Sequence, residues 1–135
     1  MKPVNDLDDG IVLFFEPKSE SSKNAAKLSF GGMSQRTDDL DIPVSKERWD
    51  NHRKAIEDFR EDKYDELEEL KKSRVPTLVI RGDHDIGFNV EDWYPLIADL
   101  ESTELIVLPR AGHAPQHQYP DLVAKYITSF IHGWK

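Results

Sequence analysis

The sequence contains no cysteine, so it can form neither a disulfide bond nor a thiolate metal site. No apolar run approaches the roughly 20 residues of a membrane-spanning helix, and residues 1–9 lack the basic and apolar regions of a signal peptide. Positive charge is also scarce, since 18 Lys and Arg stand against 26 Asp and Glu and the net charge is −8. This balance argues against nucleic acids and anionic membranes as partners, because binding to either begins at their phosphates. We expect a soluble, cytoplasmic protein.

The second half of the 135-residue chain alternates strand and helix patterns. Residues 77–81 and 105–108 are apolar and rich in β-branched side chains without alternation, which is typical of parallel strands covered on both faces. Apolar residues recur at helical spacing over residues 91–100 and again over residues 119–130. Strand, helix, strand, helix with short links predicts a right-handed βαβα unit of the α/β class with two parallel strands.

The residue pattern in the first half of the chain predicts helices joined by an extended acidic connection. Residues 11–15 are apolar, but the run is too short to type as strand or helix. A helix is expected over residues 18–27, with Gly31 and Gly32 as its break. Ser45 is a good N-cap for a second helix, and residues 64–72 predict a third.

Two ionisable side chains follow the two predicted strands. Asp85 comes four residues after the first strand and His113 five residues after the second. The carboxyl ends of parallel strands meet at one edge of a sheet, where open α/β sheets place their ligands. A carboxylate bonded to one imidazole nitrogen fixes the tautomer and makes the other nitrogen more basic. We therefore predict an acid–base pair, with Gly82 and Gly112 allowing tight backbone turns. Taken singly, Asp85 also fits a turn-forming aspartate, and His113 an ordinary loop histidine.

Three segments resemble the C-terminal end of the α/β-hydrolase fold. They are residues 76–85, which end in Gly82-Asp83-His84-Asp85, residues 108–113, which end in Gly112-His113, and residues 119–130. In that family a Gly-x-x-Asp after one strand presents the acid of a catalytic triad, and a Gly-His after the next strand presents the base. The resemblance covers about residues 73–132 and implies that Asp85 is the acid and His113 the base.

A second, less specific resemblance to the same family lies upstream. Residues 13–17, 35–39 and 43–45 look like the helical cap of one subgroup of these hydrolases. It implies that residues 1–62 form an N-terminal tail and helical cap-like region. Residues 63–135 would then be the C-terminal portion of the hydrolase core.

The sequence departs from the family at the nucleophile. The family places a serine on a Gly-x-Ser-x-Gly turn after an earlier strand, and no such motif occurs here. The nearest approximation surrounds Ser34, but it lacks the final glycine and follows no strand, so Ser34 is not expected to be the nucleophile. The resemblance therefore implies a serine-type hydrolase of ester or similar acyl bonds that is not competent as this chain alone. The alternative is a non-catalytic remnant that acts as a binding or interaction module.

The sequence also gives expectations for cofactors and partners. His84, His117 and Asp83 could join Asp85 and His113 in a metal site, but their spacing fixes no geometry, and neither a metal nor another cofactor is expected. A sheet of two strands leaves an edge unpaired. We therefore expect self-association or a partner chain that supplies the missing sheet. A small ester-like molecule would be the substrate of the completed site.

Overall fold

The computed structural model describes residues 7–33, 35, 37–38, 42 and 44–133. The elements that precede the sheet are α1 (Leu7–Phe14), α2 (Glu20–Met33), α3 (Lys46–Arg60) and α4 (Glu66–Lys72). The sheet region comprises β1 (Thr77–Gly82), the 3-10 helix η1 (Val90–Asp92), α5 (Trp93–Ile97), β2 (Thr103–Leu108), α6 (Pro115–Gln118) and α7 (Pro120–Gly133).

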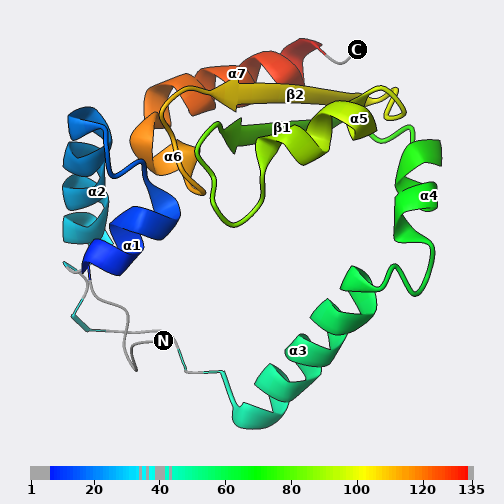
Figure 1. The fold of residues 1–135 in the computed structure, drawn as a ribbon, viewed down its shortest axis with the longest axis horizontal. Helices are drawn as coiled ribbons and strands as arrows, with labels where there is room; N and C mark the ends of the chain where they lie inside the picture. The colour runs from blue at the N-terminus through cyan, green and yellow to red at the C-terminus, as the bar shows by residue number, and fades with distance from the viewer. Residues whose placement is uncertain (1–6, 34, 36, 39–41, 43, 134–135) are drawn as a thin grey trace.

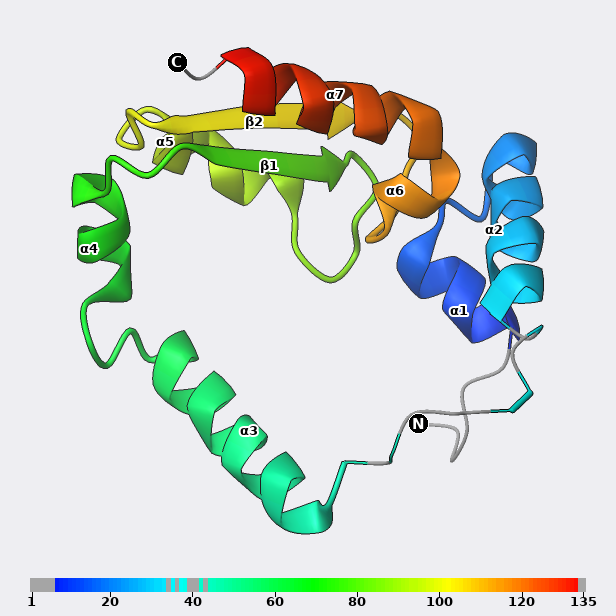
Figure 2. The same ribbon diagram turned by 180° about the vertical axis from the view of Figure 1, so that it is seen from behind.

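The two strands pair in parallel, as the sequence predicts. Their register runs from Thr77 opposite Thr103 to Gly82 opposite Leu108. Helix α7 lies along one face of this sheet and α5 lies on the other side (Figures 1 and 2). The α/β class and the two-stranded parallel sheet are therefore confirmed.

The core lies between the sheet and α7. Because side chains alternate along a strand, Ile80 and Ile106 point to the face that α7 covers. Both pack against a buried cluster of Leu108, Ala111 and Val123.

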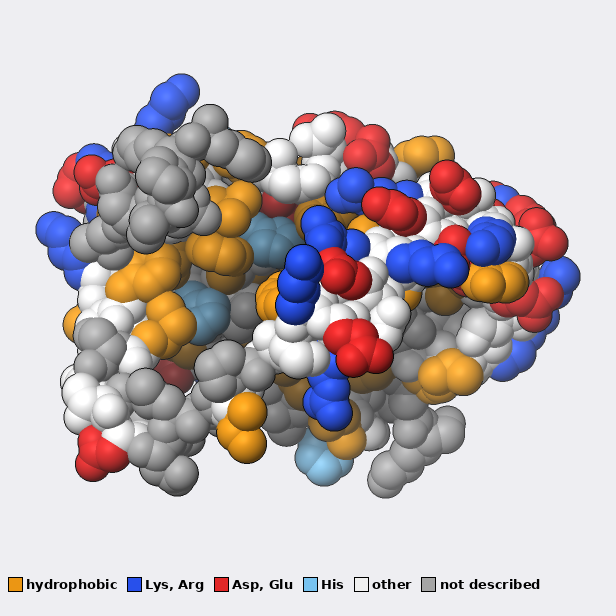
Figure 3. All heavy atoms as spheres, turned by 90° about the horizontal axis from the view of Figure 1, so that it is seen from below, with side chains coloured by type: hydrophobic (Ala, Val, Ile, Leu, Met, Phe, Trp, Pro, Cys, Tyr) orange, Lys and Arg blue, Asp and Glu red, His pale blue; other side chains and the backbone are white. Residues whose placement is uncertain are grey.

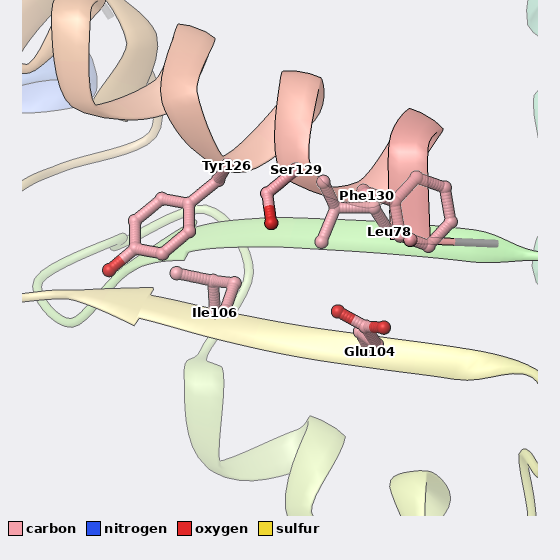
Figure 4. Close-up of a pocket in the computed structure, with 7 residues that line it drawn as sticks. Leu78, Glu104, Ile106, Tyr126, Ser129 and Phe130 are labelled. Carbon is pink, nitrogen blue, oxygen red and sulfur yellow. The ribbon is translucent and has the colours of Figure 1, made fainter.

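The core thins toward the start of the strands. There a cavity of about 390 Å³ separates α7 from the sheet. Figure 4 shows Tyr126 and Phe130 of α7 on one side of this cavity, with Leu78 and Glu104 of the strands on the other. The cavity lies away from the carboxyl ends of the strands, where α/β sheets place their ligands.

The expectation of strands buried on both faces is wrong. Residues 77–81 are half-buried, and in the whole of β1 only Gly82 is buried. The physical reason is the cover that each face receives. Helix α7 has 14 residues, whereas α5 on the other side has only five and shields little of the sheet.

Helices in the first half differ from prediction mainly in their limits. The break expected at Gly31 and Gly32 is wrong, because α2 continues to Met33. A glycine costs a helix only about 1 kcal/mol relative to alanine, which need not end it. Ser45 is the N-cap of α3, as predicted, and its hydroxyl accepts a hydrogen bond from the Arg48 N–H at 3.3 Å.

Helix α3 stands apart from the sheet and from α1 and α2 in both ribbon views (Figures 1 and 2). None of its residues is buried. Its apolar side chains include Trp49, which is 53% exposed, and Phe59, which is 68% exposed. Among the described residues, no helix combines the length and the apolar character that crossing a membrane requires.

Candidate active site

A close approach of two loops brings the predicted acid and base together. The N–H of His84 donates to the carbonyl of Ala111 at 2.9 Å, so the loop after β1 runs against the loop after β2. A Cβ added to Gly82 would lie 2.1 Å from the Ala111 carbonyl oxygen. Gly82 does not have a positive φ. The prediction that Gly82 is needed for a tight backbone turn is therefore wrong. Gly82 is needed because a side chain at this position would collide with the Ala111 carbonyl.

Gly112 has the same role toward α1. A Cβ on Gly112 would lie 2.7 Å from the carbonyl carbon of Phe14. The N–H of Ala114 donates to the Phe14 carbonyl at 3.1 Å. The end of α1 is thus pressed onto the loop that carries His113.

Asp85 and His113 are hydrogen-bonded to each other. His113 Nδ1 lies 2.9 Å from Asp85 Oδ2, and the Asp85 side chain is only 1% exposed. An ionised carboxylate only accepts hydrogen bonds, so Nδ1 is the protonated nitrogen and Nε2 is left as the basic one. The structure therefore gives the pair the arrangement that proton transfer at Nε2 requires.

Several donors keep Asp85 ionised. Burial is the largest single influence and by itself raises the pKa of Asp85. The hydrogen bond from His113, those from the backbone N–H groups of Phe88 and Gly87, and the charge of Arg81 act in the opposite direction. Together they hold the pKa of Asp85 below its ordinary value.

Two aromatic rings lie close to the His113 imidazole. The Phe88 ring stacks on it with centroids 5.5 Å apart, and the Phe14 ring lies 5.8 Å away at a tilt of 39°. These contacts and the hydrogen bond to Asp85 limit rotation of the imidazole. The exposed fraction of the His113 side chain is 33%, which leaves part of the ring accessible.

Arg81 joins the acid to this aromatic group. Its Nη2 donates to Asp85 Oδ2 at 2.6 Å and to the Phe88 carbonyl at 2.7 Å. Its guanidinium also lies 5.5 Å from the centroid of the Phe88 ring. The sequence prediction did not include Arg81, Phe88 or Phe14. A signal existed only for Arg81, since it lies four residues before Asp85.

The other two histidines considered for the site, His84 and His117, each have a separate hydrogen-bond partner. His84 Nδ1 lies 2.6 Å from Asp83 Oδ1, whereas His117 Nδ1 lies 2.7 Å from the hydroxyl of Ser29. Within the described part of the chain, no group of three or more His, Asp or Glu side chains is arranged to hold a metal ion. Ser34 lies outside the described residues.

No family model matches the chain. Over 66 residues, or 49% of its length, it is 36% identical to the Uncharacterized hydrolase YugF of Bacillus subtilis (strain 168), of which it covers 24%. Its structure is similar to the Alpha/beta hydrolase fold protein from Chitinophaga pinensis, with a TM-score of 0.66 and 18% identity over 95% of this chain and 46% of that one. The chain has part of an α/β-hydrolase fold.

This partial α/β-hydrolase fold confirms the resemblance inferred from the strand ends. The Bacillus subtilis relative carries the name of a hydrolase. The chain spans about a quarter of that relative and less than half of the solved structure. The catalytic roles of Asp85 and His113 and the boundary after residue 62 stay predictions.

Proposed function

We propose that Asp85 and His113 are the acid and base of a serine-hydrolase site that cleaves an ester or a similar acyl bond. The observation that carries this proposal is the 2.9 Å hydrogen bond between His113 Nδ1 and a carboxylate that is 1% exposed. Perturbed, buried ionisable pairs of this kind occur preferentially at functional sites.

The chemistry follows from the free nitrogen. His113 Nε2 takes the proton of a serine hydroxyl while the serine oxygen attacks the carbonyl carbon. The proton then passes from Nε2 to the leaving alcohol as the bond between the carbonyl carbon and the alcohol oxygen breaks. In the second half, Nε2 takes a proton from water as the water oxygen attacks the acyl-serine carbonyl. That proton then passes from Nε2 to the serine oxygen as the bond between this oxygen and the acyl carbon breaks, which releases the acid and restores the serine. Asp85 stabilises the imidazolium at each stage without accepting the proton.

The serine of this site would lie outside these 135 residues. The 135 residues contain no Gly-x-Ser-x-Gly motif. This chain covers 46% of the Chitinophaga pinensis structure. The serine and the oxyanion hole would be carried by segments that correspond to the part it does not cover. The substrate, a small ester-like molecule, would bind between those segments and His113.

A second candidate is a non-catalytic binding or interaction module. The absence of the Gly-x-Ser-x-Gly motif favours it. Under this candidate Asp85 and His113 would only stabilise the loops, and supplying a serine would restore no activity.

The test is a chimera in which this chain is joined to the part of the Chitinophaga pinensis fold that it does not cover. We expect the chain alone to be inactive toward 4-nitrophenyl acetate, and the chimera to hydrolyse it and to react with a fluorophosphonate. His113→Ala should lower kcat/KM of the chimera by at least about 10³-fold. Asp85→Asn should lower it by about 10³-fold to 10⁴-fold. The matched control, His132→Ala at the end of α7, should leave it within about twofold.

Three results would decide against the proposal. Hydrolysis by the chain alone, with phosphonate labelling of one of its own serines, would contradict a nucleophile outside the sequence. A folded chimera whose activity is unchanged by His113→Ala would contradict the role of His113. A folded but inactive chimera would favour the binding module.

A further inference from the structure

A cavity of about 300 Å³ lies beside His113, and Asp85 does not line it. Phe14, Phe30 and Met33 supply apolar walls. On the face of the molecule that Figure 3 presents, histidine side chains lie recessed among hydrophobic side chains in a hollow. His113 lines the cavity, and because its Nδ1 is bonded to Asp85, Nε2 is the ring nitrogen left for a ligand.

The cavity also has a polar group that the proposed reaction does not use. Ser29 of α2 and His117 of α6 both line it, and the Ser29 hydroxyl lies 2.7 Å from His117 Nδ1. A hydroxyl offers one donor and two acceptor positions. The bond to His117 occupies one of these, so Ser29 can still hydrogen-bond a ligand inside the cavity.

Size and charge restrict what fits. An enclosed apolar cavity of about 150 Å³ holds benzene. A cavity of about 300 Å³ therefore has room for one substituted ring. The described residues that line it include no Lys, Arg, Asp or Glu, so the environment favours a neutral ligand. Aromatic rings at the wall suit a flat ring, which can pack against them edge-to-face.

We propose that this cavity binds the aromatic group of a neutral arylacetic ester, in which the ring lies on the acyl side of the ester bond. The ester carbonyl would lie at the Nε2 edge of His113, and a hydroxyl or amino substituent on the ring would hydrogen-bond Ser29. This assignment of the substrate class rests on the proposed hydrolase function. The binding step itself needs no nucleophile, so it can be tested with the 135-residue chain.

The experiment is a titration of the chain with methyl phenylacetate, followed by the amide NMR signals of Ala114 and its neighbours. We expect saturable binding with a Kd on the order of 1 mM, the affinity typical of a ligand of this size. Methyl octanoate, which has the same number of non-hydrogen atoms, should bind at least about fivefold more weakly because it lacks the ring. Methyl 4-hydroxyphenylacetate should bind about fivefold more tightly through its added hydrogen bond.

Variants on α2 locate the ligand. Ser29→Phe fills the cavity and should weaken binding at least about tenfold. Leu28→Phe is the matched control, because Leu28 is the preceding residue, is 79% exposed and does not line the cavity. Ser29→Ala should abolish the preference for the hydroxyl-bearing ester while binding of methyl phenylacetate stays within about twofold.

Three outcomes would overturn the assignment. They are the absence of saturable binding, equal affinity for the octanoate ester, and a folded Ser29→Phe variant that binds as tightly as the original chain. Ring-selective binding by the chain together with an inactive chimera would refute the hydrolase proposal but not the cavity. An active chimera whose choice between arylacetic and alkanoic esters is unchanged by Ser29→Phe would refute the cavity but not the hydrolase.

Discussion

At the scale of single residues, two glycines determine how closely the site is packed. The space that a Cβ would need at Gly82 is occupied by the Ala111 carbonyl, and at Gly112 by the backbone of Phe14. These contacts are backbone against backbone, so no side-chain rotation relieves them. Asp85, His113 and Phe14 are therefore brought together by glycines, which have no side chain themselves.

Substituting Gly82 tests this packing. We expect Gly82→Ala to lower the free energy of unfolding by at least about 2 kcal/mol, because the two loops must separate to admit the methyl group. The measurement is urea unfolding followed by circular dichroism.

Gly32→Ala is the matched control for Gly82→Ala. A Cβ at Gly32 meets nothing within 4 Å, and the residue lies in α2. There the substitution should raise the free energy of unfolding by up to about 1 kcal/mol. Equal destabilisation by the two variants would show that the close approach at Gly82 has no energetic effect.

At the scale of elements, His84 connects the loop after β1 to the segment between α1 and α2. Its Nδ1 lies 2.6 Å from Asp83 Oδ1, and its Nε2 lies 3.5 Å from Glu16 Oε2. The hydrogen bond with Asp83 raises the pKa of His84; burial lowers it, and the charges of Asp83 and Glu16 raise it further. The net effect is a pKa above the ordinary value of histidine.

The direction of this pKa change predicts a pH-dependent stability. Because the folded-state pKa of His84 is raised, its stabilisation is fully present below the unfolded pKa, about 6.5, and is lost as pH rises through the folded pKa. We expect the free energy of unfolding to fall between about pH 5.5 and pH 8.5 by more in the original chain than in His84→Ala. The difference should stay below about 1 kcal/mol, since His84 is half-exposed and screened by solvent.

The comparison for His84 needs a second histidine. His132→Ala at the end of α7 removes a histidine at a distance from Asp83 and Glu16 in sequence, and it should leave the pH dependence unchanged. An identical pH dependence in the original chain and in His84→Ala would rule out the connection through His84.

At the scale of the whole molecule, much apolar surface stays uncovered. The sheet has two strands, so each strand has one edge without a neighbour within the described chain. Helix α3 exposes Trp49 and Phe59, and none of its residues is buried. Apolar surface of this kind favours association with another chain.

We therefore predict that the chain self-associates or binds a partner that completes the sheet. Alone, it should sediment as a species heavier than its 15.6 kDa mass and dissociate on dilution. The double variant Trp49→Ser, Phe59→Ser should weaken this association. It should change the free energy of unfolding of the dissociated chain by no more than about 0.5 kcal/mol, because these side chains are not buried. A monomer at every concentration would contradict self-association.

The sequence by itself determined the two strands, the start of α3 and the pairing of the site residues. Apolar β-rich runs identified both strands, and Ser45 identified the start of α3. Because parallel strands end at the same edge, the positions of Asp85 and His113 after them were enough to predict that the two side chains meet. All of these inferences use neighbours along the chain or the geometry of one sheet.

Only the tertiary structure decided what surrounds that pair. Phe14 reaches His113 from α1, 99 residues away in the sequence, and no periodicity relates the two positions. The cavity that joins Ser29 to His117 also depends on how α2 packs against α6. The physical reason is range: propensity and capping act over a few residues. Contacts between distant segments depend on backbone packing, such as the close fit at Gly112, which sequence spacing does not record.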